Sequence, residues 1–275
     1  MKATVNGIAF GYDDIGHGPA VVLLHDFPLS RSMWEPQISP LVAAGYRVIV
    51  PDLRGFGESS EAEAPCDVSV YADDVVALLN YLGIGRAVFG GMSLGGYVLF
   101  DLLERFRTRA MAAAFVATRS GADTMAEKAR WAELAGKVVK GDRRQVIDHL
   151  AGRLFAEGTV DARPTLFEKV KSWMDSTDSH TLTAGLLALR NRMDYTVPAR
   201  YLDRPALVVG GELDRSVKLE HSRFLAAALP CCTSRIISGA GRLVNMERPE
   251  EFNRCLLDFL DSLAGFRHAD WRKVA

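Results

Sequence analysis

The sequence lacks the segments that would take a protein into or across a membrane. Residues 1–7 hold one charge, polar residues and glycine, without the apolar core that a secretory signal needs. No apolar run is long enough to span a bilayer. We therefore expect a cytoplasmic protein without a membrane partner.

Cysteine is scarce, and its spacing argues against common sulfur chemistries. The four cysteines are Cys66, Cys231, Cys232 and Cys255, with no C-x-x-C pair and no metal-ligand spacing. We expect them to be reduced and to behave as buried small hydrophobes. No motif implies a metal or another cofactor, so we expect none.

An excess of charge of either sign is also absent. The formal net charge is -1 and the isoelectric point is near 6.6, which gives no electrostatic reason to expect nucleic acid as a partner. With 275 residues, 48% of them hydrophobic, the chain is long enough for one large domain or a core with an insertion. The sequence does not indicate an oligomeric state.

Short apolar runs bounded by turn signals recur along the chain. Runs of this length, with amphipathic helical patterns between several of them, favour an α/β fold with a mostly parallel sheet wound on both faces. The expected strands cover residues 20–24, 48–50, 87–90, 112–117, 206–209 and 235–237.

One long stretch interrupts this alternation. From about Gly121 to Pro198 the apolar spacing is helical throughout. Nearly eighty residues of helix within an alternating pattern predict an inserted helical cap over residues 121–197. The remaining segments, 1–120 and 198–275, would form the core.

A strand, a glycine-rich turn and a helix meet at Ser93. The segment Gly91-Met92-Ser93-Leu94-Gly95 has the G-x-S-x-G form, which is a weak signal until its context is right. Here a buried run precedes it and a helical pattern follows, as in a nucleophile elbow. The alternative is a serine that only caps the helix, with glycines kept for close packing.

Four further loops follow expected strands in order. They are His25-Asp26-Phe27-Pro28, Asp52 to Ser59, Gly211-Glu212-Leu213-Asp214, and Gly239-Ala240-Gly241-Arg242-Leu243. We interpret 52–59 as structural scaffold, with glycines that permit a tight connection.

With these landmarks in order, the sequence resembles the α/β-hydrolase superfamily, and is similar to its esterase, enol-lactonase and cofactor-free haloperoxidase branch. The resemblance implies that Ser93 is the nucleophile and Asp214 the orienting acid. It also implies an oxyanion hole formed by the backbone amides of Phe27 and Leu94, and a small-molecule ester or lactone substrate.

Two residues depart from that pattern, and both lie in catalytic loops. Arg242 stands where the resemblance places the general-base histidine, and Asp26 stands where such hydrolases usually carry glycine. An arginine cannot accept the Ser93 proton near neutral pH, so hydrolysis is expected to be weak or absent. Arg242 would instead pair with Asp214, or bind an anionic ligand such as a carboxylate.

Three interpretations stay open: a hydrolase that has lost its base, a ligand-binding protein on a hydrolase scaffold, and a perhydrolase-like enzyme, which would lack the base that it also needs. A relocated base is a further alternative, with His149 and His180 in the cap, and His17, His221 and His268 elsewhere, as less favoured candidates. Further pocket candidates, several of which are equally compatible with core packing, are His25, Asp26, Trp34, Met92, Arg119, Trp131, Trp173 and Met193.

Overall fold

The computed structural model describes residues 1–60 and 67–263, and its centre is an eight-stranded sheet in the order β1-β2-β4-β3-β5-β6-β7-β8. From β4 to β8 all neighbours are parallel, whereas β2 pairs antiparallel with both β1 and β4. The strands are β1 (Lys2–Val5), β2 (Ile8–Ile15), β3 (Ala20–Leu24), β4 (Arg47–Pro51), β5 (Ala87–Met92), β6 (Ala110–Val116), β7 (Ala206–Gly211) and β8 (Cys232–Ile237).

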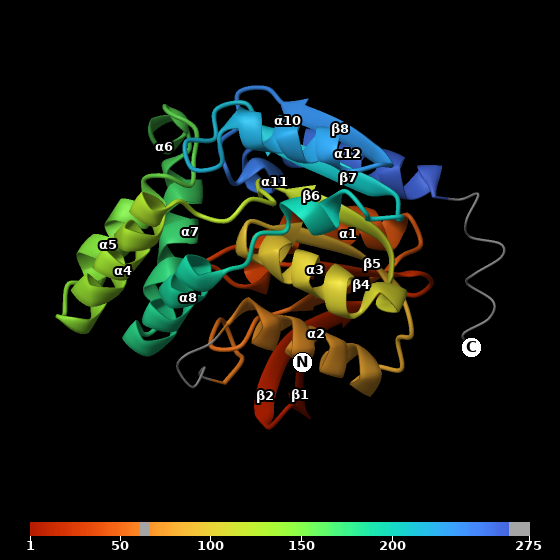
Figure 1. Cartoon of the computed structure of the whole chain (residues 1–275), viewed down its shortest axis with the longest axis horizontal. Coiled ribbons are helices and arrows are strands. Elements are labelled where there is room, and N and C mark those ends of the chain that lie inside the picture. The colour runs from red at the N-terminus through yellow and green to blue at the C-terminus, as the bar shows by residue number, and fades with distance from the viewer. Residues whose placement is uncertain (61–66, 264–275) are drawn as a thin grey trace.

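Helices cover both faces of this sheet (Figure 1). On one face α2 (Val68–Tyr81) packs beside α3 (Leu94–Arg105), and α10 (Leu219–Ala228) covers β7. On the other, α1 (Glu35–Ala43) packs beside α12 (Pro249–Ser262). Short helices occupy the connections: η1 (Arg31–Trp34), η2 (Arg107–Arg109), α9 (Thr196–Ala199) and α11 (Val244–Glu247). The predicted α/β-hydrolase architecture is confirmed.

The two N-terminal strands form a hairpin that the apolar runs do not indicate. β1 alternates exposed and buried residues, and Ala3 and Val5 turn inward. Asn6 and Gly7 form the turn with φ values of 46° and 75°, the positive values that suit a tight hairpin. The expected strand at 235–237 is also less buried than predicted, because β8 is the sheet edge and of its residues only Ile237 is fully covered.

A layer of helices lies between β6 and β7 in the chain. It contains α4 (Met125–Val139), α5 (Arg143–Ala151), α6 (Thr159–Ala162), α7 (Pro164–Asp175) and α8 (Ser179–Asn191). Figure 1 shows this group on one side of the core, in green, with α4 packed on α8 and α5 on α7. We propose that this layer is the cap expected over 121–197.

The cysteine expectation is only partly right. Cys231, Cys232 and Cys255 are free, as predicted, but none of the three is fully buried. Cys231 and Cys232 lie at the edge strand β8, where less packing covers them; Cys66 lies outside the described residues. Within residues 1–60 and 67–263, no helix combines the length and hydrophobicity of a membrane span, and no group of side chains forms a metal site.

Candidate active site

The predicted strand, turn and helix around Ser93 are present. Ser93 joins β5 to α3 with φ 48° and ψ -102°, a strained conformation for a residue other than glycine. A Cβ added at Gly91 would lie 2.3 Å from the carbonyl oxygen of Gly95, and one at Gly95 would lie 2.3 Å from that of Leu24. The backbone packing therefore requires these glycines, and Ser93 has the geometry of a nucleophile elbow.

The carboxylate of Asp26 occupies the place predicted for the oxyanion. The backbone N–H of Phe27 donates to Asp26 Oδ1 over 2.7 Å, and that of Leu94 donates to the same oxygen over 3.5 Å. These are the two amides expected to stabilise negative charge on a reacting carbonyl oxygen. In this structure they instead hold the protein's own carboxylate, which is completely buried.

Arg242 lies against Ser93 and holds Asp26 in a two-point ion pair. Its Nε donates to Asp26 Oδ2 over 2.7 Å and its Nη2 donates to Oδ1 over 3.0 Å, while Nη2 also donates to Ser93 Oγ. The expected pairing with Asp214 is thus wrong. The loop after β3 brings Asp26 into reach of the Nε–Nη2 edge of the guanidinium, in the parallel geometry that favours bidentate pairs.

Among the described residues, no cationic side chain forms an ion pair with Asp214. Its Oδ1 accepts the backbone N–H groups of Ser216 and Val217 at 2.7 and 2.9 Å. Its Oδ2 is buried without a hydrogen-bond partner in the described structure. Burial raises the pKa of this carboxyl to about 6, although the nearby positive charge of Arg242 acts in the opposite direction. Among the described residues, the carboxyl predicted to orient a base therefore has no histidine as a hydrogen-bond partner.

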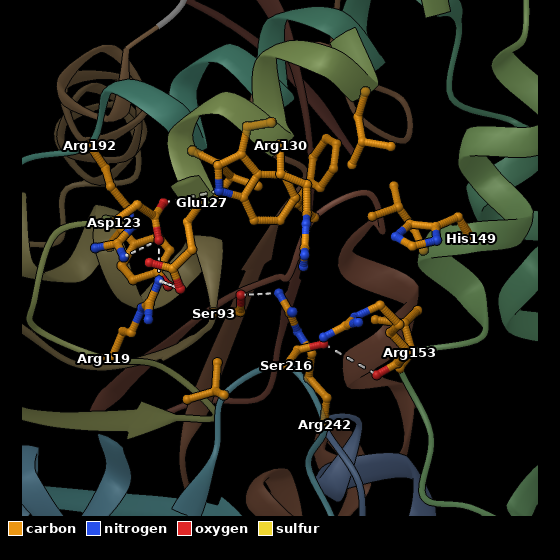
Figure 2. Close-up of a pocket in the computed structure, with 18 residues that line it drawn as sticks. Ser93, Arg119, Asp123, Glu127, Arg130, His149, Arg153, Arg192, Ser216 and Arg242 are labelled. Carbon is orange, nitrogen blue, oxygen red and sulfur yellow. Dashed lines mark hydrogen bonds and ion pairs between the residues drawn. The ribbon is translucent and has the colours of Figure 1, made fainter. Parts of the chain in front are cut away.

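A cavity of about 110 Å³ opens beside these groups. Ser93 and Arg242 lie in its wall (Figure 2), together with Phe27 and with Arg119 and Trp131, two of the residues predicted to shape a pocket. Arg119 is not free to bind a ligand, because it pairs with Asp123 and, over 2.9 Å, with Glu127.

The remaining pocket candidates do not line this cavity, each for a packing reason. His25 accepts the Leu53 amide at 2.9 Å and bonds the Asp26 carbonyl, so it organises the loop. Asp26 lies behind Arg242. Trp34 packs on Phe252 and Met92 is in the core, whereas Trp173 contacts Lys169 and Met193 is 67% exposed.

Within the described residues, no histidine side chain bonds Ser93 Oγ. Of the four described candidates only His149, on α5, lines the cavity; His221 contacts Arg119, and His17 and His180 are exposed. His268 lies outside the described residues. Among the residues described, the side chain that bonds Ser93 Oγ is that of Arg242, and a guanidinium has no lone pair to accept the serine proton.

Several cavity residues were not singled out from the sequence. Arg130 on α4, Arg153 after α5 and Arg192 after α8 all line the cavity. Arg192 pairs with Asp123 over 3.1 Å and lies over the Tyr97 ring. The signal was weak, because arginines on amphipathic helices ordinarily face solvent.

Comparison with known proteins agrees with this geometry. Residues 19–249 match the family described as alpha/beta hydrolase fold. A thermophilic esterase from Thermogutta terrifontis, solved with malate bound, is 32% identical with a TM-score of 0.91, covering 96% of this chain and 98% of its own. The enol-lactonase from Burkholderia xenovorans is 26% identical with a TM-score of 0.89, covering 95% and 100%.

A putative non-heme chloroperoxidase from Synechocystis sp. is 27% identical over 90% of this chain and 94% of its own length. The glycine-bounded Ser93 turn, the sheet order and these similarities all point to one family. The chain belongs to the α/β-hydrolase superfamily, in the branch that contains esterases, enol-lactonases and haloperoxidase-like proteins.

Proposed function

We propose that this chain binds a small carboxylate in the Ser93 cavity and does not carry out efficient ester hydrolysis through Ser93. The observation that supports this most directly is the Asp26–Arg242 pair, which fills the oxyanion position and the base position together. The scaffold is that of ester and lactone hydrolases, but its acyl-transfer groups are engaged with one another.

Each step of serine acyl transfer meets an obstacle in this arrangement. Attack by Ser93 requires a group that accepts its proton, and Arg242 only donates hydrogen bonds. The carbonyl oxygen of a substrate would need the amides of Phe27 and Leu94, which already bond Asp26. A negative charge at that position would also repel the charge that develops on the reacting oxygen.

The charge of the cavity favours a carboxylate ligand. Five guanidinium groups line it, from Arg119, Arg130, Arg153, Arg192 and Arg242, against three carboxylates: Asp123 and Glu127 in the wall, and Asp26 paired with Arg242. Guanidinium groups bind carboxylates through paired, charge-assisted hydrogen bonds. The malate-bound esterase of the same fold offers a precedent for a carboxylate ligand on this scaffold, and we extend that ligand class to this chain.

The test has two arms, hydrolysis and binding. We expect the hydrolysis of p-nitrophenyl butyrate by this chain to be unchanged by Ser93→Ala, and L-malate to raise the melting temperature. Arg242→Gln should reduce that malate shift, whereas Arg190→Gln, an exposed position outside the cavity, should not. Ser93-dependent turnover at an ordinary esterase rate, or no stabilisation by any carboxylate, would overturn the proposal.

A further inference from the structure

Among the described residues, two of the cavity arginines feel an opposite charge of the protein only at longer range, Arg130 from Glu133 and Arg153 from Asp214. Arg119 and Arg192 share Asp123, and Arg242 is paired with Asp26. In the part of the chain that the structure describes, no ion pair joins a carboxylate to Arg130 or Arg153. The Nη2 of Arg153 instead donates to the carbonyl oxygen of Arg215 over 2.8 Å.

These two arginines reach the cavity from different segments. Arg130 comes from α4 and Arg153 from the loop after α5. Figure 2 shows their guanidinium groups directed toward the space beside Ser93, where Arg242 points from below. Three cationic groups thus approach one space from separate elements, and only Arg242 brings a carboxylate partner with it.

Such an arrangement carries an electrostatic cost while the cavity holds no anion. Arg153 is half-buried, and burial together with the positive charges of Arg130 and Arg242 lowers its pKa. His149, on the same wall, is affected in the same way by burial and then by Arg153 and Arg130. An anionic ligand removes this repulsion, because it offers each guanidinium an acceptor of opposite charge.

The size of the cavity limits the ligand. A water-sized site takes roughly 10–15 Å³ of comparable volume, so a cavity of about 110 Å³ has room for a small organic molecule. A four- or five-carbon dicarboxylate is a ligand of this class. One carboxylate would meet Arg130 and the other Arg153, at separate points of the wall.

We infer that the ligand is a small dicarboxylate whose two charges are neutralised by Arg130 and Arg153. This rests on the proposed function, since it specifies the ligand of the same cavity. Arg242 would contribute to the same field, while its ion pair with Asp26 stays in place. The two cap arginines therefore determine a preference for a dianion over a monoanion of equal length.

Calorimetric titration with succinate, butyrate and inorganic phosphate tests this inference. We expect succinate to bind at least about tenfold more tightly than butyrate, since a hydrogen bond to a charged group contributes that much or more. Arg130→Gln and Arg153→Gln should each abolish most of this preference. Arg144→Gln, at an exposed position on α5 outside the cavity, serves as the matched control and should retain it.

The outcomes separate the two proposals. If butyrate binds as tightly as succinate and the two variants change nothing, the dicarboxylate assignment is wrong and the carboxylate-binding function stands. If phosphate binds more tightly than succinate, two separated carboxylates are not what the site selects. If neither carboxylate binds the unsubstituted chain, both proposals fall. Melting temperatures of the variants, measured without ligand, confirm that each is folded.

Discussion

The turn that carries Ser93 follows the hydrolase pattern, whereas the two loops that face it depart from that pattern. The turn keeps the strand, the glycines and the strained backbone that present a nucleophile. The facing loops supply Asp26 and Arg242, which bond each other and the groups that catalysis needs. Two residues can therefore change the chemistry of a site while its scaffold stays the same.

The difference also shows that the two departures belong together. A buried carboxylate at the oxyanion position would be costly alone, and so would a guanidinium at the base position. Joined by two hydrogen bonds of 2.7 and 3.0 Å, they satisfy each other. We therefore treat Asp26 and Arg242 as one unit.

Replacing both members of the unit should have the largest effect. In Asp26→Gly/Arg242→His we expect the histidine to face Ser93 and Asp214, and the amides of Phe27 and Leu94, which bond Asp26 in the parent, to become free. Because one oxyanion donor contributes about a hundredfold or more to turnover, we expect the double variant to exceed Arg242→His by at least about that factor. Hydrolysis of p-nitrophenyl butyrate measures it.

Ser93→Ala added to the double variant is the control and should remove the gain. If Arg242→His alone reached the rate of the double variant, Asp26 would not be blocking the oxyanion position. The missing base at position 242 would then be enough to explain the difference between the turn and the loops.

The second prediction concerns folding stability, measured by urea denaturation. Removing one partner of a buried ion pair costs about 3–5 kcal/mol, so Asp26→Asn and Arg242→Met should each lower the free energy of unfolding by about that amount. The combined variant should lose much less than the sum of the two. Asp26 has no exposed side-chain surface and Arg242 has 11%.

The pair Arg47–Asp14 provides a matched control between neighbouring strands. It also has two hydrogen bonds, of 2.8 and 2.7 Å, but its side chains are 30% and 15% exposed. We expect its coupling energy to be below about 1 kcal/mol. Additive losses for Asp26 and Arg242 would mean that they do not act as one unit.

The sequence predicted the core better than the interactions in the site. The buried runs at 20–24 and 87–90 fall within strands because a doubly covered sheet requires continuous apolar residues. The hairpin of β1 and β2 was missed, although its Asn6-Gly7 turn is a recognised hairpin signal. Exposed and buried residues alternate along β1. The strand therefore contains no continuous apolar run, which was the signal used to predict strands.

In the site, chain order placed Ser93 and Arg242 together but could not choose the partner of Arg242. Asp26 and Asp214 both follow core strands, and only the three-dimensional path of the β3 loop decides between them. The roles of Arg130 and Arg153 were not predictable for a similar reason. Whether a helical arginine faces solvent or a cavity depends on how the cap lies over the sheet.

The smallest expected effect concerns Asp214, which is buried in the loop after β7. Its pKa is raised to about 6 in the folded chain, against about 4 for an unfolded aspartate. The folded state then binds the proton more tightly, so this group's contribution to stability falls as the pH rises from about 4 to 6. Above about pH 6 the buried, ionised carboxylate lowers the free energy of unfolding by a constant amount.

Asp214→Asn removes the charge while its amide oxygen can still accept the Ser216 and Val217 amides. We expect the variant to be more stable than the parent by about 1–3 kcal/mol at pH 7.5, with the difference vanishing near pH 4. Urea denaturation across this range measures it. A less stable Asp214→Asn at pH 7.5 would show that the carboxylate has a charged partner after all. In Asp26→Gly/Arg242→His the same substitution should instead abolish the restored turnover, because a histidine at 242 needs that carboxylate to orient it.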